Sequence, residues 1–198
     1  NEIIFTSGGS ESNNTAIFGT AYSRKNIGKH IITTKIEHPS VLNPMKRLES
    51  EGYKVTYLDV DETGHISLSD LKKALTPNTI LVSIMAVNNE VGSIMPLEEI
   101  GQIVKNSNAY FHVDAVQGIG NIDIDVKKMN IDLLSTSAHK INGPKFLGFL
   151  YENENIHIPS LILGGEQETK RRAGTENVPG IAGFGEAVSE IAAISKKD

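Results

Sequence analysis

The sequence contains no cysteine. This absence excludes disulfide bonds and cysteine-ligated metal sites, and it leaves the chain without a thiolate nucleophile of its own. No apolar run approaches the roughly 20 residues that a transmembrane helix needs. The opening residues, Asn1 to Phe5, have neither the basic start nor the apolar length of a signal peptide. We therefore expect a cytoplasmic protein.

Long runs of like charge are also absent. The net charge of -5 comes from acidic and basic residues that are interspersed along the chain, and the basic run at residues 170–172 is short. This pattern argues against nucleic acids and membrane surfaces as partners.

The length and composition are those of one ordinary globular domain, with 198 residues, 39% hydrophobic and 22% charged. The chain opens with Asn1, and its first residues already form a predicted strand that enters a motif. We therefore expect it to be an internal piece of a longer protein.

Short apolar runs rich in Ile, Val and Leu alternate with amphipathic stretches, and this alternation predicts strands and helices. The predicted strands cover residues 3–5, 31–34, 55–58, 80–85, 110–113, 133–135 and 146–150. The predicted helices cover residues 11–24, 40–50, 69–75, 97–107 and 180–196. Within the second helix, Pro44 predicts a late start or a kink.

This order of elements predicts an α/β fold, in which a mostly parallel central sheet lies between two layers of helices. Ligands of such sheets bind beyond the carboxyl ends of the strands, so the loops that follow the strands are the candidate site. The long, Gly-rich segment 156–179 is a further candidate binding loop.

Two of these loops have residues suited to phosphate and carbonyl chemistry. Gly9 and Ser10 lie between the first strand and its helix, where free backbone N–H groups favour a phosphate; a tight turn with Ser10 as the N-cap is the competing interpretation. Lys140 follows a strand and a cluster of hydroxyls and a histidine, so it is a candidate Schiff-base amine. Taken alone, this stretch favours a solvated surface lysine.

Three further strand ends have polar residues. Asp114 ends an apolar strand, and a pyridinium nitrogen would compensate the cost of burying its charge; a structural aspartate that caps the next turn is the alternative. His38 has a flat ring that can stack on an aromatic cofactor, although a lone histidine is more often structural. Asn89 offers an amide to an anionic group, or belongs to a plain turn.

The five strand ends together supply a phosphate loop, a stacking ring, an amide, a carboxylate and a lysine. In this combination the sequence resembles the NifS-type cysteine desulfurases, which are pyridoxal-phosphate (PLP) enzymes of the fold-type I, class V aminotransferase group. The matching motifs lie at residues 5–13, 37–38, 87–92, 112–117, 137–145 and 172–177. The last of these, Arg-Ala-Gly-Thr-Glu-Asn, points to the branch that contains NifS.

The resemblance implies a role for each residue around the cofactor ring. Lys140 would hold PLP as a Schiff base and later move protons at the substrate Cα. Asp114 would keep the pyridine nitrogen protonated, and Gln117 would bind the phenolic oxygen. His38 would stack on the ring and act as an acid or base, and Asn89 would lie near the cofactor and the substrate carboxylate.

The resemblance also implies a phosphate site and a second subunit. The residues that would hold the phosphate are Gly9, Ser10, Ser137 and His139. Thr175 resembles the residue that reaches the phosphate of the neighbouring subunit, which implies a homodimer with shared sites. The family needs no metal ion for this chemistry.

The implied reaction converts L-cysteine to L-alanine and leaves the sulfur as a persulfide on an enzyme cysteine. The sulfur then passes to an acceptor or scaffold protein for iron–sulfur clusters or thiolated cofactors. We expect residues 1–198 to be the PLP-binding large domain, without its initial segment and the small C-terminal domain. The persulfide cysteine and the substrate-carboxylate arginine would lie outside the chain, so the isolated piece should be inactive.

Three alternatives stay open at this point. A selenocysteine lyase or another class V aminotransferase would share Lys140, Asp114 and the phosphate loop. A non-catalytic dimerisation module is also consistent with a chain that lacks part of its active site, although it would not need the cofactor-contacting residues. A nucleotide-binding Rossmann domain is disfavoured because no Gly-x-Gly-x-x-Gly follows the first strand.

Overall fold

The computed structural model describes residues 2–195. Its strands are β1 (Ile3–Thr6), β2 (His30–Thr34), β3 (Lys54–Leu58), β4 (Thr79–Met85), β5 (Tyr110–Asp114), β6 (Leu133–Ser135) and β7 (Gly148–Glu152). Its helices are α1 (Gly9–Ser23), α2 (Pro39–Ser50), α3 (Leu68–Ala74), α4 (Leu97–Val104), the 3₁₀ helix η1 (Ala138–Ile141), α5 (Gln167–Lys170) and α6 (Val178–Ser195).

All seven strands form one sheet in the order β1-β7-β6-β5-β4-β2-β3. Pairing is parallel from β3 through β6, and β7 runs antiparallel to both of its neighbours. Because β1 pairs antiparallel with β7, it points in the same direction as the other parallel strands. The sheet is therefore mostly parallel, as the alternation of strands and helices predicts.

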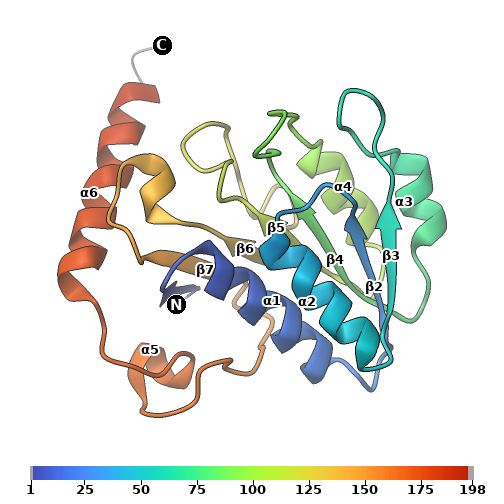
Figure 1. Ribbon diagram of the computed structural model, residues 1–198, viewed down its shortest axis with the longest axis horizontal. Coiled ribbons are helices and arrows are strands. Elements are labelled where there is room, and N and C mark those ends of the chain that lie inside the picture. Colours follow the sequence, from blue (N-terminus) through green and yellow to red (C-terminus); the bar gives the residue numbers. More distant parts are fainter. Residues whose placement is uncertain (1, 196–198) are drawn as a thin grey trace.

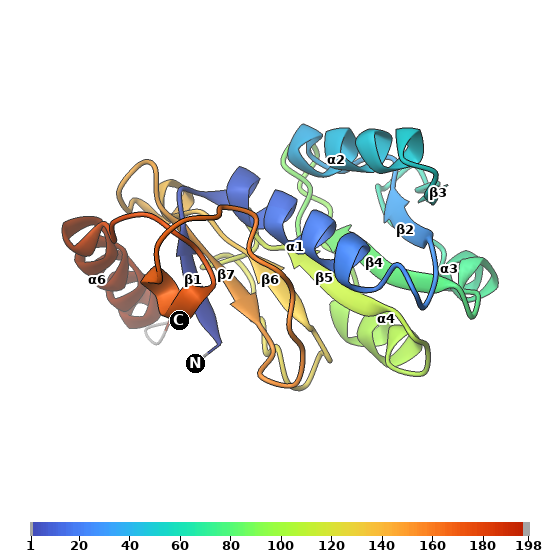
Figure 2. The same cartoon turned by 90° about the horizontal axis from the view of Figure 1, so that it is seen from below.

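Helices cover both faces of this sheet. Figure 2 shows α1 and α2 on one face and α3 and α4 on the other, while α6 lies beside the end of the sheet that contains β1 and β7. Every residue of β2 and β4 is buried, which is the expected state of a strand between two helical layers. The three-layer α/β/α prediction is confirmed.

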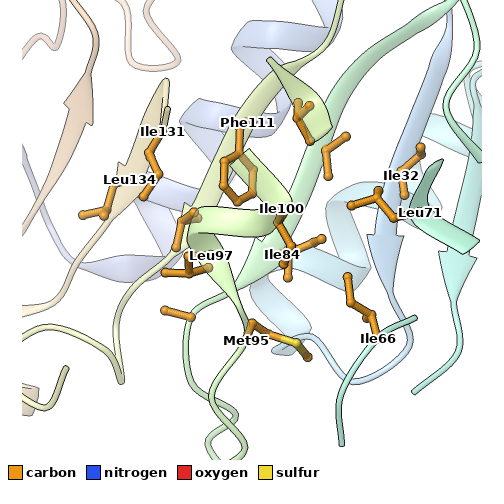
Figure 3. Packing of buried hydrophobic residues seen from close by; sticks show 14 of the residues in the cluster. Ile32, Ile66, Leu71, Ile84, Met95, Leu97, Ile100, Phe111, Ile131 and Leu134 are labelled. Atoms are coloured by element: carbon orange, nitrogen blue, oxygen red, sulfur yellow. The ribbon is translucent and has the colours of Figure 1, made fainter. Parts of the chain in front are cut away.

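The largest apolar cluster lies between the sheet and the layer of α3 and α4. Figure 3 shows Phe111 of β5 and Ile84 of β4 pointing toward Ile100 of α4, and all three are fully buried. Burying a large aliphatic or aromatic side chain stabilises a fold by about 1.5–3 kcal/mol. This cluster therefore anchors β4 and β5, the two strands at the centre of the sheet.

Several predicted boundaries need correction. The helix α2 begins at Pro39, before Pro44, because Pro39 occupies the first turn and the His38 side chain caps the helix by accepting a hydrogen bond from Ser40 N. The predicted late start is therefore wrong. The last strand begins at Gly148, which pairs with Thr6, and not at Phe146, whose φ of 55° takes it out of the strand.

Smaller differences occur at helix ends. The helix α4 ends at Val104, three residues before the predicted end, because its chain turns at the hydrogen bond from Ser107 N to Val104 O. The predicted end of the last helix, Lys196, lies outside the described residues.

The segment 156–179 is anchored to the fold by two ion pairs. Arg171 Nη2 lies 3.0 Å from Glu152 Oε2, and Arg172 Nε lies 2.8 Å from Glu11 Oε1. Between its ends the segment forms the short, distorted α5, in which Glu168 and Thr169 have positive φ values. Its assignment as a binding loop stays a prediction.

The close contact between α4 and the loop before β6 predicts a stability effect at Gly101. A Cβ atom there would lie 1.8 Å from Met129 O, so Gly101→Ala should destabilise the full-length protein by about 1–3 kcal/mol through overpacking. The matched control is Gly185→Ala in α6, where a Cβ meets nothing within 4 Å; it should gain about 0.5–1 kcal/mol of helix stability. Urea denaturation measures both, and equal effects would contradict the packing argument.

Candidate active site

A cavity of about 370 Å³ lies beyond the carboxyl ends of the parallel strands, at the edge toward which their arrowheads point in Figure 1. Nine of the ten predicted site residues line it, and Thr175 does not. Those nine are Gly9, Ser10, His38, Asn89, Asp114, Gln117, Ser137, His139 and Lys140. The parallel strands thus bring together side chains that are more than 100 residues apart in sequence, as this sheet topology predicts.

The start of α1 leaves backbone donors free at one end of the cavity. Its N-cap is Gly8, with φ 138°, and no side chain caps the helix, so the alternative in which Ser10 is the N-cap is wrong. A Cβ on Gly9 would lie 2.4 Å from Val116 Cγ2, and glycine therefore lets the helix end pack directly against the loop after β5. Free N–H groups and the helix dipole make this end suited to an anion.

The loop after β6 adds a hydroxyl, an imidazole and an amine. Ser137 is buried, and its Oγ lies 2.8 Å from His139 Nδ1. Lys140 follows on η1 and is exposed to the cavity, and its side-chain amine makes no hydrogen bond or ion pair with any residue between 2 and 195. The amine is therefore available to a ligand, which a lysine held in a surface ion pair would not be.

Asp114 is the buried charge of the site, with 4% of its surface exposed. Its Oδ1 accepts a hydrogen bond from Val116 N at 3.0 Å and its Oδ2 accepts one from Asn13 Nδ2 at 2.7 Å. Burial raises the pKa of Asp114, and these donors and the nearby His38 oppose that rise. No ion pair reaches it from the described residues, so a cation is the partner that it lacks.

Glu37 lies next to this group in the interior, although sequence patterns assigned it no role. Its Oε1 accepts hydrogen bonds from Thr34 Oγ1 at 2.7 Å and Met85 N at 3.0 Å, and its buried Oε2 has no hydrogen-bond partner. Burial, reinforced by the charge of Asp114, raises the pKa of Glu37 to about 8. The group is therefore mostly protonated at neutral pH.

The two neighbouring asparagines in the turn after β4 have different environments. Asn88 is buried and builds the turn, because its Oδ1 accepts hydrogen bonds from Glu90 N and Val91 N, both at 2.9 Å. Asn89 is exposed and lines the cavity instead. The plain-turn interpretation thus applies to Asn88, whereas the Asn89 side chain faces the cavity and donates from Nδ2 to Glu90 Oε1 at 2.8 Å.

Thr175 lies in a separate hollow of about 120 Å³ beside Arg172, Glu168 and the start of β7. Next to it, Arg172 donates from Nε and Nη2 to both oxygens of Glu11, at 2.8 and 3.1 Å. Burial raises the pKa of Glu11, but the hydrogen bonds from Arg172 and Ser7 outweigh it and lower the pKa below its ordinary value. Glu11 is therefore an ionised carboxylate whose charge is compensated.

Sequence patterns assigned no role to Asn13 and Ser40, which contact each other and residues of the cavity. Asn13 is buried in α1 and bonds both Asp114 and Ser40, and Ser40 lines the cavity beside His38. A signal was available, since Asn13 lies one helical turn, four residues, after Gly9 and so shares its face.

The whole described fold agrees with comparisons to known proteins. The family model for aminotransferase class-V matches residues 1–198. This chain belongs to that family. Members of the family depend on PLP.

Individual relatives agree with this membership. The chain is 59% identical to the protein named cysteine desulfurase IscS from Clostridium botulinum. The matched 188 residues cover 95% of this chain and 47% of that protein. A solved NifS-like protein matches with a TM-score of 0.94 at 45% identity, over 97% of this chain and 53% of that one. A structure of SspA in complex with cysteine matches with a TM-score of 0.91 at 47% identity, over 94% and 55%.

The chain spans about half the length of the curated relatives it matches. Within residues 2–195, no helix is long and apolar enough to cross a membrane. The same residues contain no group of three or more histidine, aspartate and glutamate side chains arranged to hold a metal ion.

The groups that line the cavity match the functional groups of PLP. The cofactor has a phosphate, a pyridine nitrogen and an aldehyde, and the cavity offers an uncapped helix start, a buried carboxylate without a cation and an unpaired lysine amine. Its volume of about 370 Å³ is in the range of small-molecule sites, roughly 300–1,000 Å³.

The buried state of Glu37 predicts a pH-dependent stability. Between its ordinary pKa of 4.5 and about 8, the folded protein binds a proton that the unfolded chain has lost, so stability falls as pH rises through this range. Glu37→Gln removes the titrating group and should therefore reduce the loss of stability between pH 4.5 and pH 8. Denaturation midpoints measured at these two pH values check this. Glu62→Gln on the surface is the control, and an unchanged slope in Glu37→Gln would contradict the assignment.

Proposed function

We propose that the protein containing this chain is a PLP-dependent cysteine desulfurase, which converts L-cysteine to L-alanine and transfers the sulfur to a cysteine of the enzyme. The observation on which this depends is that Lys140, Asp114 and the uncapped start of α1 share one cavity. The names of the relatives support the reaction type, since the proteins that match at 51–59% identity include several called cysteine desulfurase.

Each residue of the cavity has a place in this proposal. The phosphate would lie against the backbone of Gly9 and Ser10 and the side chains of Ser137 and His139, and His38 would stack on the ring. When bound, PLP serves as an electron sink that stabilises negative charge at the substrate Cα. Asp114, buried and without a cation of its own, would hold the proton on the pyridine nitrogen.

The remaining groups bind the substrate and move its protons. Lys140 is unpaired, so its amine can anchor the cofactor and then take or give a proton at Cα. Gln117 and Asn89 line the same cavity, where Gln117 would donate to the phenolic oxygen and Asn89 would bind near the substrate carboxylate. His38 would act as the acid or base on the side of the ring that it covers.

Sulfur transfer needs a thiol, and the chain has none. We propose that residues 1–198 are the PLP-binding large domain of a longer protein, and that the persulfide cysteine and the arginine for the substrate carboxylate belong to its other parts. The isolated piece would be inactive for that reason. The sulfur acceptor would be a separate protein, in a pathway for iron–sulfur clusters or thiolated cofactors.

A homodimer is part of the proposal. Thr175 is exposed and lies outside the cavity of its own chain, as expected of a residue that reaches the phosphate of a second subunit. Phe146 and Leu163 are each 85% exposed, and large apolar side chains at that exposure suit an interface. We place the protein in the cytoplasm because a reactive thiol stays reduced there.

The cofactor assignment predicts covalent trapping at Lys140. Full-length protein incubated with PLP should show a visible absorption band, and borohydride reduction should attach the pyridoxyl group to the peptide containing Lys140, as peptide mass spectrometry detects. Lys140→Ala should abolish both signals. Lys145→Ala, which changes an exposed lysine outside the cavity, should retain both, and trapping that survives in Lys140→Ala would contradict the assignment.

The reaction assignment predicts equal amounts of L-alanine and sulfide from L-cysteine in the presence of a thiol reductant. Lys140→Ala should reduce this turnover to background, and Lys145→Ala should leave it unchanged. A selenocysteine lyase would share the same cavity, so L-selenocysteine is the competing substrate. Turnover of L-selenocysteine with none of L-cysteine would replace the proposed function by that alternative.

A further inference from the structure

A chain of hydrogen bonds connects His38 to Asp114 beneath the cavity. His38 Nδ1 lies 2.8 Å from Ser40 Oγ, Asn13 Nδ2 lies 2.9 Å from the same Oγ, and Asn13 Nδ2 lies 2.7 Å from Asp114 Oδ2. The four residues come from α1, the start of α2 and the end of β5. Two of them, Asn13 and Asp114, are 1% and 4% exposed, so water has little access to the lower part of the chain.

The direction of these hydrogen bonds follows from a group that can only donate, the backbone N–H of Ser40. This group donates to His38 Nδ1 at 3.1 Å. Nδ1 is therefore an acceptor, and the neutral ring must have its proton on Nε2. Ser40 Oγ also faces Nδ1, so its hydroxyl proton points to the ring and its lone pairs are left for Asn13.

Asn13 is held in one orientation by the carboxylate. Its Nδ2 group uses one hydrogen for Asp114 Oδ2 and the other for Ser40 Oγ, while its buried Oδ1 has no hydrogen-bond partner. A flipped amide would point an oxygen at the charged carboxylate, which is repulsive. The unpaired oxygen is thus the energetic cost of directing both donors toward Asp114 and Ser40.

We propose that Asn13 and Ser40 are positioning residues. The backbone N–H of Ser40 keeps the His38 ring in its Nε2–H form, and the Ser40 hydroxyl and the Asn13 amide tie the placement of the ring to the carboxylate of Asp114. This inference rests on the proposed function, in which His38 and Asp114 contact PLP. Asn13 orients the Ser40 hydroxyl, and the hydroxyl orients the ring. Asn13 therefore acts on two catalytic groups at once, although it touches neither substrate nor cofactor.

The test compares variants that cut the chain at different points in the full-length protein. Ser40→Ala removes the hydroxyl beside His38, Ser40→Thr retains a hydroxyl there, and Asn13→Leu removes both amide donors at similar size. The matched control is Ser67→Ala, which removes a hydroxyl at the start of α3 that accepts from Asp70 N, away from the cavity.

The first measurement is the nitrogen NMR signal of the His38 ring in ¹⁵N-histidine-labelled protein without cofactor, assigned by its loss in His38→Gln. Wild type, Ser40→Thr and Ser67→Ala should show one form, with Nε2 protonated and Nδ1 bare. Ser40→Ala and Asn13→Leu should keep the Nε2–H form, because the backbone N–H of Ser40 remains. Their Nδ1 signal should shift from its wild-type position, because the hydroxyl beside Nδ1 is lost or no longer oriented. An Nδ1 signal at the wild-type position in both of these variants would overturn the proposal.

The second measurement is steady-state turnover of L-cysteine. Ser40→Ala should lower kcat about threefold to tenfold, the equivalent of one net hydrogen bond, with a smaller effect on KM, and Ser40→Thr should recover most of it. An unchanged kcat in Ser40→Ala would overturn the proposal. If wild type does not turn over L-cysteine, the proposed function fails, and the NMR comparison decides the positioning role by itself.

Discussion

The burial of one carboxylate, Asp114, at the end of β5 is the constraint on which the rest of the site depends. An ionised carboxylate in an apolar interior is costly unless donors and a cation surround it. The fold supplies donors from Val116 and Asn13 and no cation from the described residues. In the proposed function, a ligand with a protonated ring nitrogen would therefore gain more from this cavity than a neutral ring would.

The layer beneath Asp114 strengthens this selection because it is polar and uncharged. His112, two residues earlier on the same strand, lies between Ser83 Oγ of β4 at 2.8 Å and Ser135 Oγ of β6 at 2.9 Å. Burial lowers the pKa of His112 to about 3, so its ring is neutral at neutral pH. It ties three strands together without supplying a positive charge that would compete with the ligand for Asp114.

A second negative charge, that of Glu11, lies toward the opposite end of the cavity. Glu11 lies in the first turn of α1, where its negative charge would repel a phosphate bound at the free N–H groups. The paired hydrogen bonds from Arg172 compensate that charge, and they also fasten the segment 156–179 to the start of the helix. This segment, which contains Thr175, is thereby placed by the same contact that would favour the proposed anion site.

The order of strands and helices and the set of strand ends with polar groups could be predicted from the sequence, because apolar periodicity is a local property and parallel strands end at one edge. Gly9, Asp114 and Lys140 could thus be assigned to one site. Two features could be seen only in the folded protein: Asn13 contacts Asp114, 101 positions away, and Glu37 is buried and mostly protonated. Protonation and hydrogen-bond direction depend on burial and on neighbours distant in sequence, which no local pattern encodes.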